Sequence, residues 1–444
     1  MPFAWPKSLP LIFMAAVPLF LAWAPARALL GAAVSKLPSS KSCLMPCSMR
    51  RRRGGGAAKA ARRLLCRSSS SSSKSSVVGG NGAGKVIVIA GPTAVGKSSV
   101  ALALCKDLGG EIVSCDSVQV YRDVVIGCNK PSQEEMKEVR HHLVDVASLN
   151  ETFTAGDFVK LAEAAIDDIL SRGRVPVVVG GTMMYLHWLV HGRPDAPKKD
   201  RAVAQAVATE LLPFQNRGDW EGALEVLRAL NATRAASMTP NNWYRLSRSL
   251  EVLRTTNDSG DEAFTGISKP ISKKYDFRSF FIVGDRERLF RRIDKRCEEM
   301  LVRGLLSETA ELLVRGMLDP ASPAGRAIGY RQAIDFLFQE ARLVETSHVA
   351  TGGASGRASG SCQRAISEPE TRFLEFFLTF AAKTRQYSGA QMKWFRSFKG
   401  RDFSWQAWDL GGRSRRYAVQ AATHFLMRPK TAPERVTGAT GGAW

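Results

Sequence analysis

Lys85-Val86-Ile87-Val88-Ile89-Ala90 leads directly into Gly91-Pro92-Thr93-Ala94-Val95-Gly96-Lys97-Ser98. The first stretch is a short run rich in β-branched residues, and apolar residues with helical spacing follow the second stretch at Val100, Leu104 and Leu108. A strand, a loop of the form G-x-x-x-x-G-K-[ST] and a helix in this order are typical of a phosphate-binding P-loop. The alternative is a structural glycine-rich turn that holds no ligand.

The residue types of this loop indicate its chemistry. Its glycines let successive backbone N–H groups face a phosphate, and the helix N-terminus adds partial positive charge. Lys97 supplies a mobile cation, and the hydroxyl of Ser98 can hold Mg²⁺.

Three further apolar runs have the composition of strands. Glu111–Ser114 ends at Cys115-Asp116-Ser117, Val175–Val179 ends at Gly180-Gly181-Thr182, and Ser279–Val283 follows much later. The segment Phe158–Leu170, between the first two runs, has a helical pattern. Near-continuous apolar strands separated by helices predict a parallel sheet that is covered on both faces. The predicted fold class is therefore α/β, with a P-loop NTPase-like parallel sheet covered by helices.

The pattern along the chain predicts five segments. Residues 195–265 show only helical periodicity and should form an all-helical insertion, and a stretch near 341–365 is rich in Ser, Gly, Ala and Thr, which is typical of a disordered insertion. The predicted segments are a targeting leader over 1–80, a P-loop catalytic core over 81–194, the helical insertion over 195–265, completion of the core with further helices over 266–410, and a C-terminal tail over 411–444.

The leader carries much of the basic charge. The 444-residue chain has 63 Lys and Arg against 41 Asp and Glu, yet its first acidic residue is Asp107. An apolar stretch, Leu9–Leu30, is interrupted by prolines and followed by Arg50–Arg53 and the serine run Ser68–Ser73. An entry signal followed by a basic, hydroxylated, acid-free segment predicts import into a plastid, with the mitochondrion as the alternative. No later stretch is apolar enough to span a membrane, so we expect a soluble mature protein without stable membrane association.

The eight cysteines do not form a metal-binding pattern. No Cys-x-x-Cys pair occurs anywhere in the chain, so the sequence predicts no zinc site. Isolated thiols of this kind are expected as small buried residues in a reducing compartment.

One acidic residue, Asp116, follows a predicted strand near the predicted phosphate site. A carboxylate there can act as a general base toward a nucleophile or as an indirect metal ligand. The alternative interpretation is a turn or helix cap for the residues Ser117–Gln119.

Basic residues form two further patterns. Arg292 and Arg296 lie four residues apart on a predicted helix, where their repulsion must be offset by an anion such as pyrophosphate or by Glu299. Basic and aromatic residues alternate in Trp243–Arg248 and Met392–Arg396, which suits contact with RNA phosphates and stacking on bases. Solvated helix faces with the aromatic rings in the core are the alternative.

The ordered segments resemble one family, the tRNA dimethylallyltransferases of bacteria and organelles. The resemblance extends from about Lys85 to about Phe398. It rests on Gly91-Pro92-Thr93-Ala94-Val95-Gly96-Lys97-Ser98, Ser114-Cys115-Asp116-Ser117-Val118-Gln119-Val120-Tyr121, Ile126-Gly127-Cys128-Asn129-Lys130-Pro131, Gly180-Gly181-Thr182-Met183-Met184-Tyr185, Arg245-Leu246-Ser247-Arg248, Arg326-Ala327-Ile328-Gly329-Tyr330-Arg331-Gln332 and Thr384-Arg385-Gln386-Tyr387.

The resemblance implies transfer of a dimethylallyl group from its diphosphate to the exocyclic amine of the adenine 3′ of the tRNA anticodon, with Mg²⁺ as cofactor. The P-loop would then hold a pyrophosphate leaving group, and no nucleotide need be split. Gly91–Ser98 would bind the diphosphate, with Ser98 at the metal. Asp116 would take the proton from the amine, while Thr182 and Arg296 would assist at the phosphates and the substrate.

The resemblance also implies a set of tRNA-contacting residues and a monomeric enzyme whose helical insertion grips the anticodon stem. The set is Asp116, Ser117, Val118, Gln119, Tyr244, Arg245, Leu246, Ser247, Arg248, Arg326, Tyr330 and Arg331. The sequence departs from the bacterial pattern at Gly389-Ala390, where a Lys-Arg pair is usual, and has no Cys after Cys362 for the zinc finger of cytosolic relatives.

Three alternatives remain open at this stage. Adenylate isopentenyltransferases prenylate free AMP, ADP or ATP. They do not need the segments around Arg245–Arg248 and Gly329–Gln332, so the presence of these segments favours tRNA as the acceptor. A small-molecule P-loop kinase would consume ATP without a prenyl donor. An RNA-binding module that has lost catalysis would bind tRNA without turnover.

Overall fold

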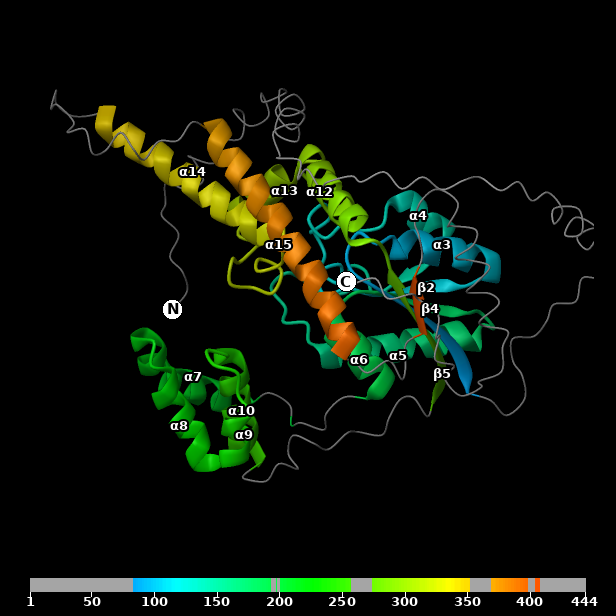
Figure 1. Ribbon diagram of the computed structural model, residues 1–444, viewed down its shortest axis with the longest axis horizontal. Helices are drawn as coiled ribbons and strands as arrows, with labels where there is room; N and C mark the ends of the chain where they lie inside the picture. Colours follow the sequence, from blue (N-terminus) through cyan, green and yellow to red (C-terminus); the bar gives the residue numbers. More distant parts are fainter. Residues whose placement is uncertain are drawn as a thin grey trace, which may run out of the picture. The chain divides into compact units, whose positions relative to one another are not determined.

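The computed structural model describes residues 83–192, 197, 200–256, 274–351, 369–397 and 404–407 (Figure 1). The predicted leader over 1–80, most of the insertion near 341–365 and the tail over 411–444 lie outside the described residues. The described chain forms two compact units, one built from 83–123, 130–289 and the segment after Gln386, the other from 124–129 and 290–386.

A parallel sheet lies at the centre of the first unit, as the sequence predicted, and it has six strands. Its order is β3-β2-β4-β1-β5-β6. The strands are β1 (Gly84–Ala90), β2 (Glu111–Cys115), β3 (His141–His142), β4 (Pro176–Gly180), β5 (Tyr275–Val283) and β6 (Ser404–Ala407). The strand that precedes the P-loop, β1, lies between β4 and β5, so the loop emerges from the middle of the sheet.

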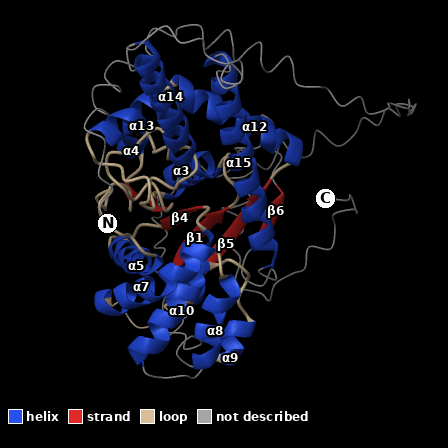
Figure 2. Cartoon of the chain, turned by 90° about the vertical axis from the view of Figure 1, so that its left-hand side faces the viewer, coloured by secondary structure: helices blue, strands red, loops and turns tan. Residues whose placement is uncertain are grey.

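Helices cover both faces of this sheet. Val86 and Val88 of β1 pack with Phe158 and Ile166 of α5 (Ala155–Ser171) and with Leu186 of α6 (Met183–His191). Helix α3 (Lys97–Leu108) lies on the opposite side of the sheet from α5 (Figures 1 and 2). The short helix α4 (Gln133–Glu138) begins with a capping box at Ser132. Burial on both faces explains why the strand sequences are almost continuously apolar.

The described part of the predicted insertion is helical and has a core of its own. It contains α7 (Arg201–Arg217), α8 (Trp220–Leu230), α9 (Ala232–Ala236) and α10 (Trp243–Thr256). Their apolar faces meet around Leu211, Leu227, Leu246 and Leu250. Asp200, Asp219 and Asn231 cap the first three helices through their side chains. Such caps begin each helix where the apolar periodicity begins.

The second unit is helical. It contains most of α12 (Arg286–Val302), α13 (Leu305–Val314), α14 (Tyr330–Thr351) and the first part of α15 (Pro369–Ser397). Phe336 of α14 stacks on Phe376 of α15 at a centroid distance of 4.9 Å. Helix α14 differs from the sequence prediction, because it continues to Thr351 through the first part of the predicted insertion. Ser, Thr and Ala at these positions do not prevent a helix, since only Gly and Pro disfavour it strongly.

Two smaller expectations can be compared with the described residues. Cys105, Cys115, Cys128 and Cys297 are buried thiols, as expected. Within the described part of the chain, no helix is both long and apolar enough to cross a membrane.

Candidate active site

The P-loop joins β1 to α3 through a backbone that only particular residues can adopt. Gly96 has φ of 101° and stands at the N-terminus of α3. A Cβ atom at Gly91 would lie 2.7 Å from the carbonyl oxygen of Ile282, so no side chain fits there. The Nζ atom of Lys97 donates a hydrogen bond to the carbonyl oxygen of Pro92 at 2.8 Å. The lysine is thus folded back over its own loop, where a bound phosphate would lie.

Asp116 follows the last residue of β2 and is half-buried. Its Oδ1 atom accepts hydrogen bonds from the backbone N–H groups of Val118, at 2.9 Å, and Gln119, at 3.3 Å. The capping role that we considered as an alternative is therefore present. No described residue donates a hydrogen bond to Oδ2, so one carboxylate oxygen is held while the other remains able to accept a proton.

Thr182 lies beside the Asp116 segment because β2 and β4 are neighbours. A Cβ atom at Gly180 would come within 1.9 Å of the carbonyl oxygen of Cys115, so glycine permits the two strands to end in close contact. The Oγ1 atom of Thr182 accepts a hydrogen bond from the backbone N–H of Ser117 at 3.1 Å. Two of the three predicted catalytic residues, Asp116 and Thr182, thus lie on segments that contact each other.

Burial decides the chemistry of the adjacent thiol. Cys115 is completely buried, and burial raises its pKa well above the ordinary value, an effect to which the nearby charge of Asp116 adds. The thiol therefore stays protonated and is not a nucleophile.

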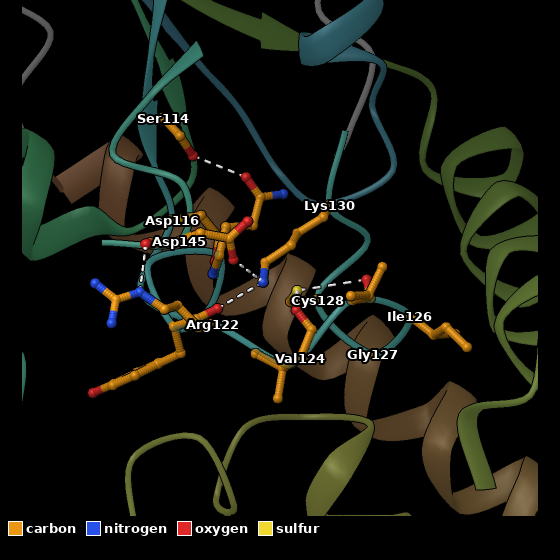
Figure 3. A network of polar contacts seen from close by, with 12 residues as sticks. Ser114, Asp116, Arg122, Val124, Ile126, Gly127, Cys128, Lys130 and Asp145 are labelled. Carbon is orange, nitrogen blue, oxygen red and sulfur yellow. Dashed lines mark hydrogen bonds and ion pairs between the residues drawn. The ribbon is translucent and has the colours of Figure 1, made fainter. Parts of the chain in front are cut away.

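A buried lysine fixes the far end of the Asp116 segment (Figure 3). The Nζ atom of Lys130 donates a hydrogen bond to the carbonyl oxygen of Tyr121 at 2.7 Å and forms an ion pair with Asp145. Arg122 donates from Nε to the carbonyl oxygen of Asp145 at 3.1 Å. Lys130 belongs to a motif that the sequence analysis quoted but to which it assigned no role. Its place directly before Pro131 did not indicate that its charge is buried.

Gln391, near the end of α15, was also missed as a site residue. Its side-chain amide bonds to the backbone of Thr93 in the P-loop and to the backbone of Gly181. The sequence offered only its place after Thr384–Tyr387, which does not distinguish a buried amide from an exposed one.

The model of one family, IPP transferase, matches residues 119–398. The chain belongs to the IPP transferase family. Among curated relatives, "tRNA dimethylallyltransferase 9" of Arabidopsis thaliana is 39% identical over an alignment of 342 residues, and the match covers 70% of this chain and 69% of that one. A tRNA dimethylallyltransferase of Protochlamydia amoebophila is 36% identical over 313 residues, with 70% and 81% of the two chains covered.

Solved structures of IPP transferases agree with the fold. The full-length tRNA isopentenylpyrophosphate transferase of Bacillus halodurans is 26% identical, with a TM-score of 0.50 and 77% of this chain and 95% of that chain covered. A eukaryotic dimethylallyltransferase, described as acting on tRNA, is 26% identical with a TM-score of 0.56, and the match covers 73% of each chain. The predicted α/β fold and the family resemblance are both confirmed.

The structure divides the implied set of tRNA-contacting residues into buried and accessible side chains. Leu246 and Tyr330 are both fully buried, so their side chains are not available to RNA. Leu246 lies in the core of the helical insertion. Tyr330 donates a hydrogen bond to Glu308 at 2.6 Å and accepts one from the backbone N–H of Gly127 at 3.1 Å. Both residues support the surface segments that precede and follow them.

Other members of this set are exposed. Tyr244, Arg245, Arg326 and Arg331 have exposed side chains, with Tyr244 84% exposed. Arg248 is half-buried and donates to Glu251 and to the carbonyl oxygen of Pro197. Ser247 and the segment Ser117–Gln119 are half-buried as well.

The third predicted catalytic residue of the IPP transferase, Arg296, lies on the part of α12 that belongs to the second unit. It is half-buried. Glu299, the alternative partner that the sequence suggested for Arg296, has its Oε1 atom 4.0 Å from the Nζ atom of Lys295.

Proposed function

We infer that this chain transfers a dimethylallyl group to tRNA. The observation that carries this inference is the match to relatives named tRNA dimethylallyltransferase over 69% and 81% of their length. These relatives favour tRNA over free adenine nucleotides as the acceptor. The P-loop and the loops that bear Asp116 and Thr182 all lie at the carboxyl ends of adjacent strands. In open parallel sheets, ligands bind at that edge.

The residues of this edge suit prenyl transfer from a diphosphate to the adenine 3′ of the anticodon. The bond between the allylic carbon and the diphosphate oxygen breaks, and a bond from that carbon to the adenine amine forms. The amine proton then passes to the Oδ2 atom of Asp116. Negative charge grows on the departing pyrophosphate, where Lys97 and the N-terminus of α3 offer positive charge. The family resemblance also assigns Arg296 a role at the phosphates, which stays a prediction.

The donor atoms at this edge suit Mg²⁺. This ion prefers oxygen ligands and usually takes only one or two from the protein, the others coming from phosphate and water. Accordingly, the described residues need not supply a cluster of metal ligands, and they contain no group of three His, Cys, Asp or Glu that would enclose a metal. The exposed hydroxyl of Ser98 and the carboxylate of Asp116 are oxygen donors here. Bound Mg²⁺ would offset charge on the leaving pyrophosphate.

Exposed basic and aromatic residues of the helical insertion and the second unit suit contact with the anticodon stem-loop. Tyr244 can stack on a base, while Arg245, Arg326 and Arg331 can pair with phosphates. The target adenine has to leave its stack to reach Asp116. The basic leader supports a plastid location, with the mitochondrion as the alternative, and we propose a monomer.

The decisive experiment offers labelled dimethylallyl diphosphate to the full chain, together with either an unmodified tRNA or free AMP, ADP and ATP. We expect label only in tRNA and only with Mg²⁺ present, and mapping of the label to the adenine 3′ of the anticodon. Label in free nucleotides would instead identify a cytokinin-synthesising relative. ATP consumption without prenyl transfer would indicate a kinase.

A further inference from the structure

The amide of Gln391 lies between two loops of the proposed active site. Its Oε1 atom accepts a hydrogen bond from the backbone N–H of Thr93, and its Nε2 atom donates one to the carbonyl oxygen of Gly181, both at 2.9 Å. The residue is only 1% exposed. The two partners precede it by 298 and 210 residues. We propose that Gln391 is a positioning residue that holds the P-loop and the Thr182 loop at the spacing needed for the diphosphate.

The two contacts require a side chain that accepts and donates a hydrogen bond at the same time. The primary amide offers an acceptor and a donor on one rigid plane, whereas a carboxylate can only accept and a thioether can do neither well. The space beside the amide is too small for a side chain at Gly181. A Cβ atom there would lie 2.4 Å from Nε2 of Gln391 and 3.1 Å from the carbonyl oxygen of Gly91. The amide therefore fills the gap between the two loops, and the glycine makes room for it.

The end of α15 is itself held firmly, so the amide has a fixed origin. Phe395, one helical turn after Gln391, is buried in the sheet core, and its ring lies 4.5 Å from that of Phe281 in β5. The neighbouring ring of Trp394 lies 6.0 Å from His187 of α6. The end of α15 is therefore fixed against the sheet and α6, and through Gln391 it fixes the P-loop relative to both.

The contact of Gln391 with Thr93 also indicates which N–H groups of the P-loop can bind phosphate. The N–H of Thr93 is occupied by Gln391 and anchors the loop. We therefore assign phosphate contact to the N–H groups of Ala94 and of Gly96 to Ser98, and to the Thr93 hydroxyl, because the N–H of Val95 donates to the carbonyl oxygen of Pro92 at 3.4 Å. This deepens the proposed function, because it rests on a diphosphate as the P-loop ligand.

The same amide is linked to the proposed base. Gly181 is followed by Thr182, whose Oγ1 atom accepts from the N–H of Ser117, and Ser117 follows Asp116. Loss of the amide should therefore affect donor binding first and the chemical step second. A tRNA contact by the exposed residues of the helical insertion should not change.

The test compares Gln391→Met, which keeps the side-chain volume, with the wild-type full chain. We expect the KM for dimethylallyl diphosphate to rise about tenfold or more and kcat to fall, while the KM for tRNA stays within about twofold. Gln391→Glu should bind the donor more weakly still, because it places a negative charge beside the diphosphate. Ser388→Ala is the matched control. Ser388 is also buried, one turn earlier on α15, and among the described residues its Oγ atom has no hydrogen-bond partner.

A second variant tests the same contact from the other side. Gly181→Ala should displace the amide and raise the donor KM in the same direction, even if Gln391→Met does not fold. Donor binding is also measured by calorimetry without tRNA. If the wild type fails to transfer the prenyl group to tRNA, the proposed acceptor is rejected, but the donor affinities of the wild type and the variants can still be compared. Unchanged donor KM and donor affinity in the folded variants would overturn the role of Gln391. Equal increases in the donor and tRNA KM values would do the same, since they would indicate a general structural effect.

Discussion

Glu111 and Arg172 form a double hydrogen-bonded ion pair at the start of β2. The Nη2 atom of Arg172 lies 2.8 Å from Oε2 of Glu111, and its Nη1 atom bonds to Oε1. Arg174 and His142 also bond to this carboxylate, whose residue is completely buried. The hydrogen bonds from Arg172 are the main cause that lowers the pKa of Glu111 to about 2, against the opposing effect of burial. This cluster lies at the end of β2 opposite to Asp116, and we assign it a structural role.

Glu111→Gln should lower the free energy of unfolding by about 1.5 to 3 kcal/mol, because a neutral amide replaces a buried carboxylate that accepts charge-assisted hydrogen bonds from Arg172 and Arg174. Urea denaturation at neutral pH measures the difference. Glu138→Gln is the control, because Glu138 is paired with Lys106 on the surface and should contribute at most about 0.5 kcal/mol. An equal, small effect of both substitutions would contradict the structural role.

The same residue predicts a pH dependence. The pKa of Glu111 is lower in the folded state than its ordinary value of 4.5, so its stabilising effect is complete above that value. The effect is lost as the pH falls from about 4.5 toward 2. Over this window the stability of the wild type should fall more steeply with decreasing pH than that of Glu111→Gln. Parallel curves would show that Glu111 is not the titrating group.

Asp116→Asn should abolish prenyl transfer while leaving tRNA and donor binding within a few fold. Asparagine keeps an Oδ1 acceptor for the N–H groups of Val118 and Gln119, so the loop is preserved, but it cannot take a proton. Loss of a general base typically costs about 10² to 10⁴ in rate. Single-turnover transfer and direct binding assays separate the two effects. A near-normal rate would remove Asp116 from the mechanism.

Lys97→Ala should act mainly through dimethylallyl diphosphate, since its ammonium group lies at the P-loop, 2.8 Å from the carbonyl oxygen of Pro92. We expect weaker donor binding and a slower transfer step, with tRNA affinity retained. Lys85→Ala serves as the control, because this exposed lysine lies at the opposite end of β1. Donor affinity and rate that match those of the control variant would refute the proposed role.

The two neighbours of Arg245 should have different roles, Leu246 in stability and Tyr244 in tRNA binding. Leu246→Ala empties a buried site and should cost about 2 to 5 kcal/mol of stability. Tyr244→Ala removes an 84% exposed side chain, should leave stability within about 0.5 kcal/mol and should weaken tRNA binding through lost base stacking. Thermal unfolding and tRNA affinity measured on both variants give the comparison. Normal tRNA affinity of Tyr244→Ala would place the RNA elsewhere.

Much of the sheet was predictable because its strands are apolar over their whole length. Val86–Ala90, Ile112–Cys115 and Val177–Val179 are buried, which produces the uniform pattern that indicates a parallel sheet. Two strands were not predictable. β3 contains two residues and β6 four, too few for any periodicity to appear.

The site was predictable where neighbouring residues form it. In the P-loop, a strand, two glycines, a lysine and the start of a helix follow within a few residues, so the local sequence alone indicates this loop and its proposed phosphate site. Only the tertiary structure decided that Lys130 is buried against Tyr121, that Tyr330 is a core residue, and that Gln391 bonds to Thr93. The bonds of Gln391 to Thr93 and of Tyr330 to Gly127 join residues 298 and 203 positions apart, and they form only after packing brings these segments together. The bond of Lys130 to Tyr121 spans only nine positions, but it depends on how the loop between them folds. A polar side chain has no pattern that distinguishes such a buried partner from a solvated surface residue.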